Sequence, residues 1–335
     1  AGKVRRKAAP EARGMALIWK ERCGSVLLIE QGIIHSMTGE AWQGDVLVEN
    51  GRILRLEKRV DPTTLALETV LDARGLHVWP GLLDANTHVG LTEENPQCVD
   101  PADAAFAQAA AAGITVVEVC PAGSTPAPRR CTLWQTGSHP KQLDKPGALL
   151  LPMEGETESQ LRNDLMQARA QGCRVKLQAG TEAELALALR LWQAYGGAVT
   201  LEHRAPTAAL AEEIAHSGMP VVVGVARKRG AESAYSLAAR LMKLGAVVAL
   251  STDHPTARIH HLPLCAGLCL RYGVEEKAAM AAVTCNAASA MGLEDGWGRL
   301  APGRQADMVL LDGSPLRLAT AVRYTVIHGQ VAFTR

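Results

Sequence analysis

Short apolar runs alternate with Ala- and Leu-rich segments of helical spacing along residues 78–300. Short apolar runs bounded by turn residues predict strands, and apolar residues repeating at helical spacing predict helices. The expected strands lie near residues 78–83, 114–119, 131–135, 148–153, 173–178, 198–203, 220–225 and 246–251. The expected helices cover residues 157–170, 182–195, 207–216, 232–244, 262–272 and 274–291. Eight strands separated mostly by helices predict an α/β fold, a (β/α)8 TIM-like barrel.

One stretch of this region does not follow the pattern. Residues 121–147 contain five prolines, and proline removes a backbone donor and clashes inside a helix. We therefore expect a long loop or a degraded repeat unit here.

Both ends of the chain have strand character. Apolar runs at residues 26–29 and 44–48 flank turn residues, and Asn50-Gly51 between apolar runs is a strong hairpin signal. Strand character returns at residues 307–311 and 322–333. Ahead of these segments, residues 1–14 are basic and Ala-rich, so we expect a disordered basic arm.

Composition and charge exclude several classes of protein. The net charge of +1 over 335 residues argues against a general nucleic-acid binder, which needs a basic face. No apolar run approaches the ~18 residues that cross a bilayer, and Lys20 interrupts the apolar stretch that begins at Met15, so neither a membrane span nor a signal peptide is expected. The expected location is the cytoplasm.

The eight cysteines lie in mostly apolar surroundings without a Cys-x-x-Cys pair. Cys265 and Cys269 are four residues apart on an expected helix, which is the spacing of half a metal site. The simpler interpretation is that the cysteines are buried, reduced and hydrophobic in role.

Two of the expected strands end in polar residues that could bind a metal ion or take part in catalysis. The stretch 78–88 reads Val-Trp-Pro-Gly-Leu-Leu-Asp-Ala-Asn-Thr-His, and 246–255 reads Ala-Val-Val-Ala-Leu-Ser-Thr-Asp-His-Pro. Because side chains alternate along a strand, Asn86 and His88 are expected to point the same way. The carboxyl ends of parallel barrel strands converge on one site, so Asp253 is expected near them.

These motifs resemble the amidohydrolase superfamily. Pro80-Gly-Leu-Leu-Asp84 followed by Asn-Thr-His88 is similar to its Pro-Gly-Leu-Ile-Asp-x-His-x-His signature, and Ser251–Pro255 is similar to its eighth-strand motif. Residues 298–312 resemble its return to a small flanking sheet. The similarity runs from about Val26 to the C-terminus, and the imidazolonepropionase-like and dihydroorotase-like branches resemble the chain most, the former more closely.

The resemblance implies a small flanking β-sandwich beside the barrel, formed from the N- and C-terminal segments. The expected domains are then the arm at 1–14, a composite β domain of 15–77 plus 301–335, and a barrel domain of 78–300.

The resemblance also implies a divalent metal ion, with zinc the expected ion if one is bound. Zinc lowers the pKa of bound water and polarises the scissile carbonyl. Carried over residue by residue, the metal ligands are His88, His203, Asp253 and Glu154. Asp253 and His203 are the catalytic residues, with Asp253 moving a proton from water to the leaving nitrogen.

Two positions depart from the family pattern. Asn86 stands where the signature has its first His, and Gln178 stands where the fifth strand would supply another. Carboxamide oxygens suit magnesium or calcium better than zinc. Together with His254, Asn86 and Gln178 are assigned to substrate contact.

Two functions remain open at this point. The first is a metal-dependent hydrolase of a non-peptide C–N bond, perhaps in a cyclic amide, acting on a small molecule. The second is a barrel without metal or catalysis that serves as a binding, regulatory or assembly subunit, because fold and site are separable. The expected partners are a small-molecule substrate and a second copy of the chain, with neither nucleic acid nor membrane.

Overall fold

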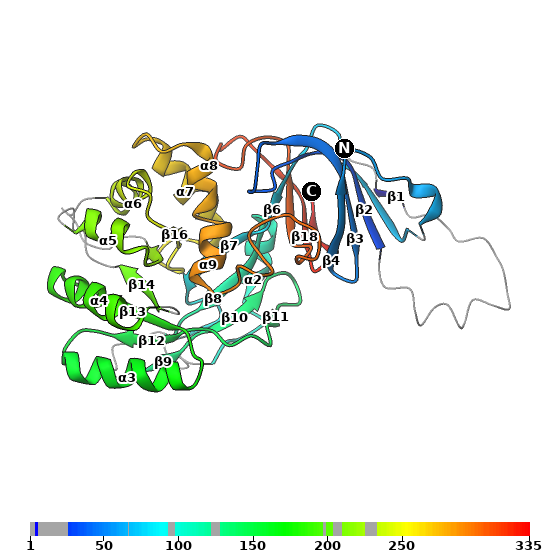
Figure 1. Ribbon diagram of the computed structural model, residues 1–335. Coiled ribbons are helices and arrows are strands. Elements are labelled where there is room, and N and C mark those ends of the chain that lie inside the picture. The colour runs from blue at the N-terminus through cyan, green and yellow to red at the C-terminus, as the bar shows by residue number, and fades with distance from the viewer. Residues whose placement is uncertain are drawn as a thin grey trace.

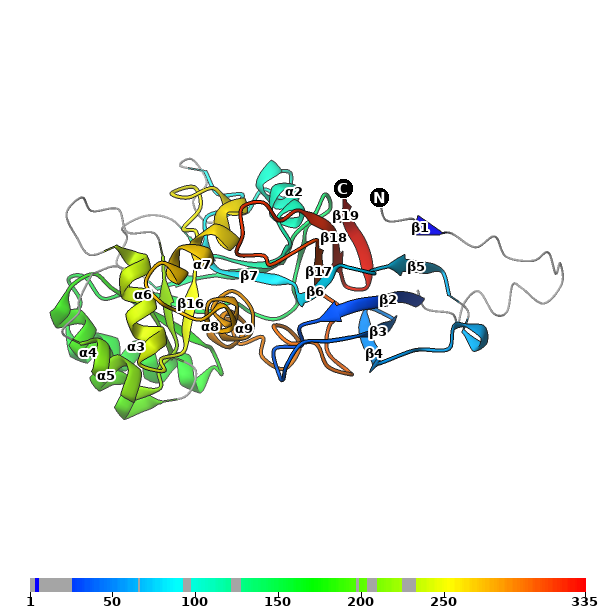
Figure 2. The same cartoon turned by 90° about the horizontal axis from the view of Figure 1, so that it is seen from above.

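The computed structural model describes residues 4–5, 26–65, 67–92, 98–121, 128–196, 199–203, 210–224 and 233–335. The predicted basic arm at 1–14 lies outside these residues except for the short strand at 4–5. A large sheet occupies one side of the molecule, and most of the helices gather on the other side around two smaller sheets (Figures 1 and 2).

The large sheet has nine strands drawn from both ends of the chain. The pairing of β6 with β17 joins the two ends, which confirms that N- and C-terminal strands share one sheet. The predicted hairpin is also confirmed, since Asn50 and Gly51 have φ of 53° and 75°, as a two-residue turn of this kind requires. The strands are β1 (Val4–Arg5), β2 (Val26–Ile34), β3 (Trp42–Glu49), β4 (Arg52–Glu57), β5 (Thr69–Asp72), β6 (His77–Pro80), β17 (Met308–Leu311), β18 (Val322–Ile327) and β19 (Gln330–Thr334).

Two smaller sheets carry the strands predicted for the barrel, with one correction. The first predicted strand, 78–83, is divided at Gly81: residues 78–80 belong to β6 of the large sheet, and the strand in the smaller sheet begins at Leu82. The first of the two smaller sheets has the order β11-β10-β8-β7 and the second the order β16-β15-β14-β13-β12-β9. Strands β7 and β8 pair in parallel, and so do β12 to β16 in sequence order. The strands are β7 (Leu82–Thr87), β8 (Ile114–Val119), β9 (Arg129–Arg130), β10 (Thr132–Gln135), β11 (Lys141–Gln142), β12 (Leu149–Pro152), β13 (Val175–Ala179), β14 (Val199–His203), β15 (Val221–Val223) and β16 (Val248–Leu250).

The predicted third barrel strand was wrong in its direction. Strand β10 runs antiparallel to β8, and β9 runs antiparallel to β12. A parallel partner needs a crossover of a dozen or more residues, usually a helix, whereas an antiparallel strand can follow a shorter connection. The chain therefore folds back along β8 as β10 before it reaches β12.

Apart from α2, for which no range is predicted, the helices follow the predicted ranges closely, with one exception. They are α2 (Ala104–Ala111), α3 (Glu158–Ala170), α4 (Glu182–Tyr195), α5 (Ala211–Ser217), α6 (Ala234–Lys243), α7 (Leu262–Leu270), α8 (Glu276–Ala281) and α9 (Cys285–Ala290), with 3-10 turns η1 (Pro62–Thr64) and η2 (Ile259–His261). Among the described residues, no helix is both long enough and apolar enough to pass through a bilayer.

The exception is the helix predicted over 274–291, which is divided between Ala281 and Cys285. The carbonyl oxygens of Ala282 and Val283 leave the helix and accept hydrogen bonds of 2.9 Å from the backbone N–H groups of Leu250 and Leu83. These bonds attach the break to β16 and β7, which belong to different sheets. The break therefore links the two smaller sheets.

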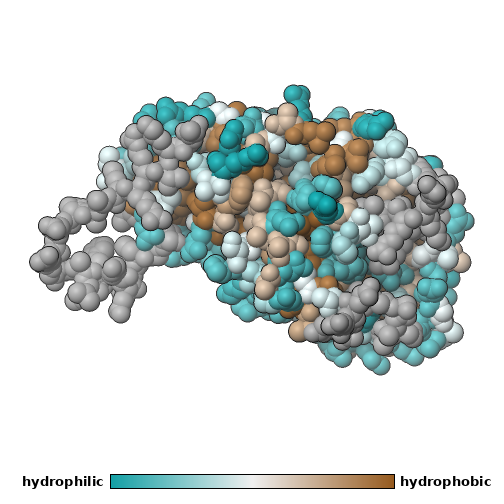
Figure 3. Space-filling model, turned by 180° about the vertical axis from the view of Figure 1, so that it is seen from behind, coloured by the Kyte–Doolittle hydropathy of each residue, from teal (hydrophilic) through white to brown (hydrophobic). Residues whose placement is uncertain are grey.

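The core has two layers in this part of the molecule. One cluster fills the space between strands and helices, with Leu177, Leu201 and Leu241 among its members. A second cluster, with Leu83, Val116 and Ala249, packs between the strands and α9. On the outer surface seen in Figure 3, apolar side chains lie among polar ones.

Candidate functional site

Gln178 and Glu202 lie side by side near the carboxyl ends of adjacent strands. The parallel register of β13 and β14 places them opposite each other, so both point to the same face of the sheet. The Gln178 Nε2 group donates to Oε1 and Oε2 of Glu202 at 3.2 and 3.3 Å. Glu202 is only 2% exposed, so this amide supplies a buried carboxylate with a hydrogen-bond donor.

Asn86 joins this pair to Asp253. The pairing of β7 with β8 shifts register between Asp84 and Thr87. The Asn86 Nδ2 group donates to Oδ1 of Asp253 at 2.9 Å and lies 3.5 Å from Oε1 of Glu202. We call the four side chains of Asn86, Gln178, Glu202 and Asp253 the amide–carboxylate cluster. It gathers residues from β7, β13, β14 and the segment after β16.

The segment after β16 is tied to β7 by several hydrogen bonds. The Ser251 hydroxyl bonds to the backbone oxygen of Asn86 and to Oδ1 of Asp253. The Thr252 hydroxyl donates to Oδ2 of Asp84 at 2.6 Å, and the Thr252 N–H also faces this carboxyl group. Burial raises the pKa of Asp84 to about 7, although the hydrogen bonds from Thr252 act in the opposite direction. Asp84, which ends the Pro-Gly-Leu-Leu-Asp motif, therefore positions the segment that carries Asp253.

A buried ion pair lies on the same face of β13, two residues before Gln178. Lys176 is fully buried, and its Nζ contacts Oε2 of Glu118 at 2.5 Å and the oxygen of Ala85 at 2.7 Å. Arg174 reaches Oε1 of Glu118 at 3.1 Å. Burial alone would raise the pKa of Glu118. The two cations outweigh this effect, so the pKa lies below its ordinary value. Lys176 thus connects β13 to β7 and β8, two residues before Gln178.

His88 and His254 are joined through their backbones. The His88 N–H donates to the oxygen of His254 at 2.9 Å, and the His88 ring Nδ1 lies 2.7 Å from the oxygen of Cys120. Burial lowers the pKa of His254. Strand β7 ends at Thr87, so the alternation that predicts a common direction for Asn86 and His88 does not extend to His88.

Comparison with known proteins identifies the family. A model of the amidohydrolase family matches residues 154–333, which is more than half of the chain. The chain belongs to the amidohydrolase family.

Similar proteins agree with this family. Two imidazolonepropionases match parts of the chain, the enzyme of Rubrobacter xylanophilus at 42% identity over 80 residues and that of Symbiobacterium thermophilum at 35% over 159 residues. These matches cover 23% and 45% of this chain, but only 19% and 36% of the relatives' own lengths.

A solved structure supports the fold. The crystal structure of an amidohydrolase from Thermotoga maritima MSB8 superposes with a TM-score of 0.79 at 22% identity, covering 92% of this chain and 100% of that one. The chain therefore has a TIM-like barrel fold with α/β content.

The described side chains do not form the zinc site expected for this family. No group of three or more His, Cys, Asp or Glu side chains within the described ranges is placed to hold a metal ion. Glu154 is exposed in the turn after β12, and His88 bonds to Cys120. The backbone of His203 ends β14, but its side chain lies outside the described part, as do Arg227, Lys228 and Arg229.

Sequence reasoning missed Glu202, although a signal was present. Val175, Leu177 and Ala179 alternate with Lys176 and Gln178, and Val199 and Leu201 alternate with Thr200 and Glu202. The apolar members pack against the helices, so the polar members share the inner face. The same alternation marks Lys176, which pairs with Glu118.

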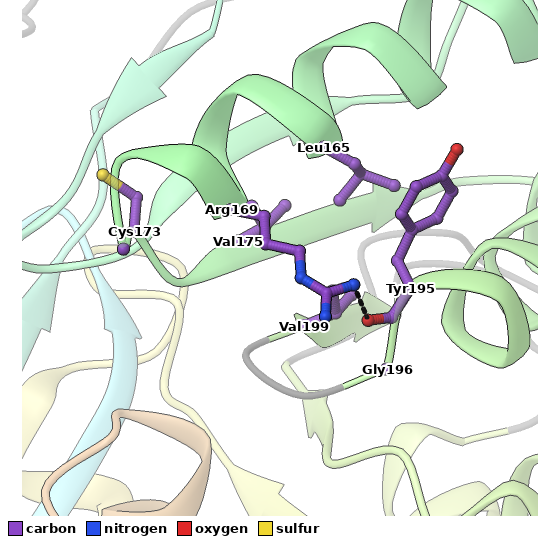
Figure 4. A pocket seen from close by; sticks show the side chains of 8 residues that line it. Leu165, Arg169, Cys173, Val175, Tyr195, Gly196 and Val199 are labelled. Atoms are coloured by element: carbon purple, nitrogen blue, oxygen red, sulfur yellow. Dashed lines mark hydrogen bonds between the residues drawn. The ribbon is translucent and has the colours of Figure 1, made fainter.

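A cavity of about 320 Å³ lies away from this site, where α3 and α4 end and strands β13 and β14 begin. Leu165, Val175 and Val199 line it, and Arg169 donates to the backbone oxygen of Tyr195 at 3.4 Å (Figure 4). The cavity lies at the amino ends of β13 and β14, whereas the amide–carboxylate cluster lies at their carboxyl ends, where catalysis in a barrel is expected. The cavity is therefore separate from the cluster.

The seven cysteines among the described residues behave largely as expected, and Cys23 lies outside these residues. Cys265 and Cys269 are buried on α7, and so are Cys120, Cys131 and Cys285, all of them free. Cys98 is exposed and Cys173 is half-buried, so the expectation of burial was wrong for these two.

Proposed function

We propose that this amidohydrolase-family protein hydrolyses a non-peptide C–N bond of a small molecule, with a cyclic amide as the favoured substrate class. The observation that carries the proposal is the convergence of Asn86, Gln178, Glu202 and Asp253 from four strand ends. In a barrel of this type the carboxyl ends of the strands are where catalysis occurs. The similarity to two imidazolonepropionases supports the choice of substrate class.

In this proposal Asp253 is the general base and then the general acid. Its carboxylate accepts a proton from the attacking water and donates it to the leaving nitrogen. Asn86 and Ser251 hold Oδ1 of Asp253 by hydrogen bonds of 2.9 and 3.1 Å. These contacts orient the Asp253 carboxylate.

Roles for the remaining residues complete the proposal. Gln178 and Asn86 contact the substrate from the cluster, and His254 contacts it from the mouth. The assignment of His203 as a catalytic residue is kept as a proposal on the family resemblance. The finer architecture is also proposed: a barrel of 78–300 with a small β domain of 15–77 plus 301–335. The sheet drawn from both ends of the chain supports the composite domain, although β6 places residues 78–80 in that sheet.

The test is turnover by the purified full chain on a panel of cyclic amides, imides and linear amides. We expect hydrolysis of at least one cyclic amide and no cleavage of ordinary peptides. For that substrate, Asp253→Asn should lower kcat by about 10²–10⁴-fold, the usual contribution of general acid–base catalysis. Asp295→Asn, a carboxylate-to-amide change near the Gly292–Gly298 turn, is the control and should leave kcat unchanged.

The alternative function predicts a different result with the same panel. A binding or regulatory subunit would bind members of the same panel, seen by calorimetry, without hydrolysing any of them.

A further inference from the structure

Cys120 and Cys131 lie side by side in the interior of the protein. Strands β8 and β10 pair antiparallel, with Val119 opposite Thr132 at the end of the printed register. Cys120 follows Val119 and Cys131 precedes Thr132, so continuing this register places the two cysteines opposite each other. Cys120 is 1% exposed and Cys131 is 0% exposed. The Cys131 Sγ donates to the Cys120 Sγ at 3.0 Å, so the two thiols are in direct contact.

The backbone around this pair suits a disulfide. The Cys120 N–H donates to the oxygen of Thr87 and the Cys131 N–H to that of Ala148, both at 2.8 Å, so the two cysteines do not exchange backbone hydrogen bonds. Opposed residues of this kind in an antiparallel pair have Cα atoms about 4.5 Å apart, and a disulfide spans about 4.4–6.8 Å between Cα atoms. Closing the sulfur separation to the ~2.05 Å of an S–S bond then requires a movement of only about 1 Å.

A cation lies beside one of the two sulfur atoms. Lys176 is fully buried, and its Nζ donates to the Cys120 Sγ at 3.5 Å. The Cys120 sulfur thus accepts hydrogen bonds from an ammonium group and from the thiol of Cys131. A neighbouring cation stabilises negative charge on a sulfur atom, which is the charge that a cysteine carries when it acts as a nucleophile. Cys120 is therefore the attacking sulfur, and Cys131 is placed to react with its product.

We propose that Cys120 and Cys131 form an oxidative modification site, at which a small hydroperoxide converts the two thiols into a disulfide. The Cys120 Sγ attacks the terminal oxygen of the hydroperoxide, the O–O bond breaks, and the thiol proton passes to the departing oxygen, which gives a sulfenic acid and an alcohol or water. The Cys131 Sγ then displaces the hydroxyl group of this sulfenic acid, the S–S bond forms, and the thiol proton leaves with the hydroxyl as water. The two thiols lose two electrons, and the hydroperoxide gains them.

The modification site is connected to the end of β7. The Cys120 carbonyl oxygen accepts a hydrogen bond of 2.7 Å from the His88 ring, and the Cys120 N–H donates to Thr87. Lys176, which contacts the Cys120 sulfur, also donates to the oxygen of Ala85 at 2.7 Å. Oxidation therefore acts on a residue that holds the strand end beside Asn86. Because neither thiol takes part in the proposed hydrolysis, the oxidation is tested without any substrate.

The experiment treats the full chain with a small excess of hydrogen peroxide and blocks the remaining thiols with N-ethylmaleimide. Digestion with trypsin and an Asp-specific protease then places Cys98, Cys120 and Cys131 on the separate peptides 84–99, 103–129 and 131–141. We expect mass spectrometry to find peptides 103–129 and 131–141 linked by a disulfide as the main oxidised product of Cys120. Dithiothreitol added after the peroxide should remove this product.

Single variants separate the roles of the two thiols. In Cys131→Ser the sulfenic acid of Cys120 has no partner, so its adduct with dimedone should increase several-fold over the wild type. In Cys120→Ser, Cys131 should remain a thiol and be recovered with N-ethylmaleimide. Cys285→Ser changes another buried cysteine, and as the control it should leave the yield of the linked peptides unchanged. Circular dichroism checks that each variant is folded.

The peptides of the wild-type chain decide the result even if a variant does not fold. Absence of the linked pair from wild-type protein in which Cys98 is already oxidised would overturn the proposal. Linkage of Cys120 to Cys98 in similar yield would also overturn it, because that product shows reaction without regard to the folded geometry. Among folded variants, equal dimedone labelling of Cys120 in the wild type and in Cys131→Ser would contradict the role of Cys131.

Discussion

Gly224, the residue after β15, faces the carboxylate of Asp253 so closely that a Cβ atom at Gly224 would lie 2.0 Å from Oδ2 of Asp253. Cβ atoms do not approach other heavy atoms at such distances. Any side chain at Gly224 would therefore displace the Asp253 carboxylate. This carboxylate accepts the hydrogen bonds of Asn86 and Ser251, so Gly224 is part of what orients it.

We therefore predict that Gly224→Ala lowers kcat/KM by about 10²-fold, because small displacements of a reacting group have effects of this size. The control is Gly180→Ala at the end of β13, where the nearest atom to the new Cβ is Oε2 of Glu184 at an ordinary 3.6 Å. Steady-state kinetics and thermal melts of both variants are the measurements. Full activity of Gly224→Ala would show that the position of Asp253 does not matter.

The buried ion pair gives a prediction about stability. Lys176→Met leaves the fully buried Glu118 without its closer cation. Removing one partner of a buried ion pair costs about 3–5 kcal/mol in the free energy of unfolding. Urea unfolding at neutral pH measures this loss. The double change Lys176→Met with Glu118→Leu should be less unstable than Lys176→Met alone, and a single-variant loss below about 1 kcal/mol would contradict the assigned pairing.

Asp84 predicts a dependence of stability on pH. Burial raises its pKa in the folded protein to about 7, whereas the unfolded value is about 3.9. Between these values the folded chain holds a proton that the unfolded chain has released. The contribution of Asp84 to the free energy of unfolding is therefore complete below about pH 4 and falls as the pH rises to about 7.

Asp84→Asn removes this titration, so its stability relative to the wild type should increase, by as much as a few kcal/mol, from pH 4 to pH 7. Urea midpoints of the two proteins across this range provide the measurement. Parallel curves for wild type and variant would mean that Asp84 has an ordinary pKa.

Regular elements were predictable because their signals are local. The helix over 157–170 is observed as Glu158–Ala170 with Thr157 as its N-cap, and the strand predicted at 173–178 is observed as Val175–Ala179. The break at Ala282 and Val283 was not predictable. It depends on hydrogen bonds to Leu83 and Leu250, which are distant in the sequence.

The site was predictable only in part, for a similar reason. Motif similarity led to Asn86, Gln178 and Asp253, and the structure joins these three. Motif similarity also favoured His203 over Glu202, because a motif gives the expected residue type and does not give the face of the strand on which that residue lies. The register of β13 and β14 settles the face of Glu202, and register follows from packing between strands.

We propose that Asn86 and Gln178 occupy places from which histidines would bind a metal ion at the mouth of the barrel. The most direct test is the zinc content of the double variant Asn86→His with Gln178→His, measured by mass spectrometry after dialysis against zinc-free buffer, beside the wild type. We predict a gain of about one zinc ion per chain in a variant that melts cooperatively. A folded double variant with no more zinc than the wild type would contradict the claim.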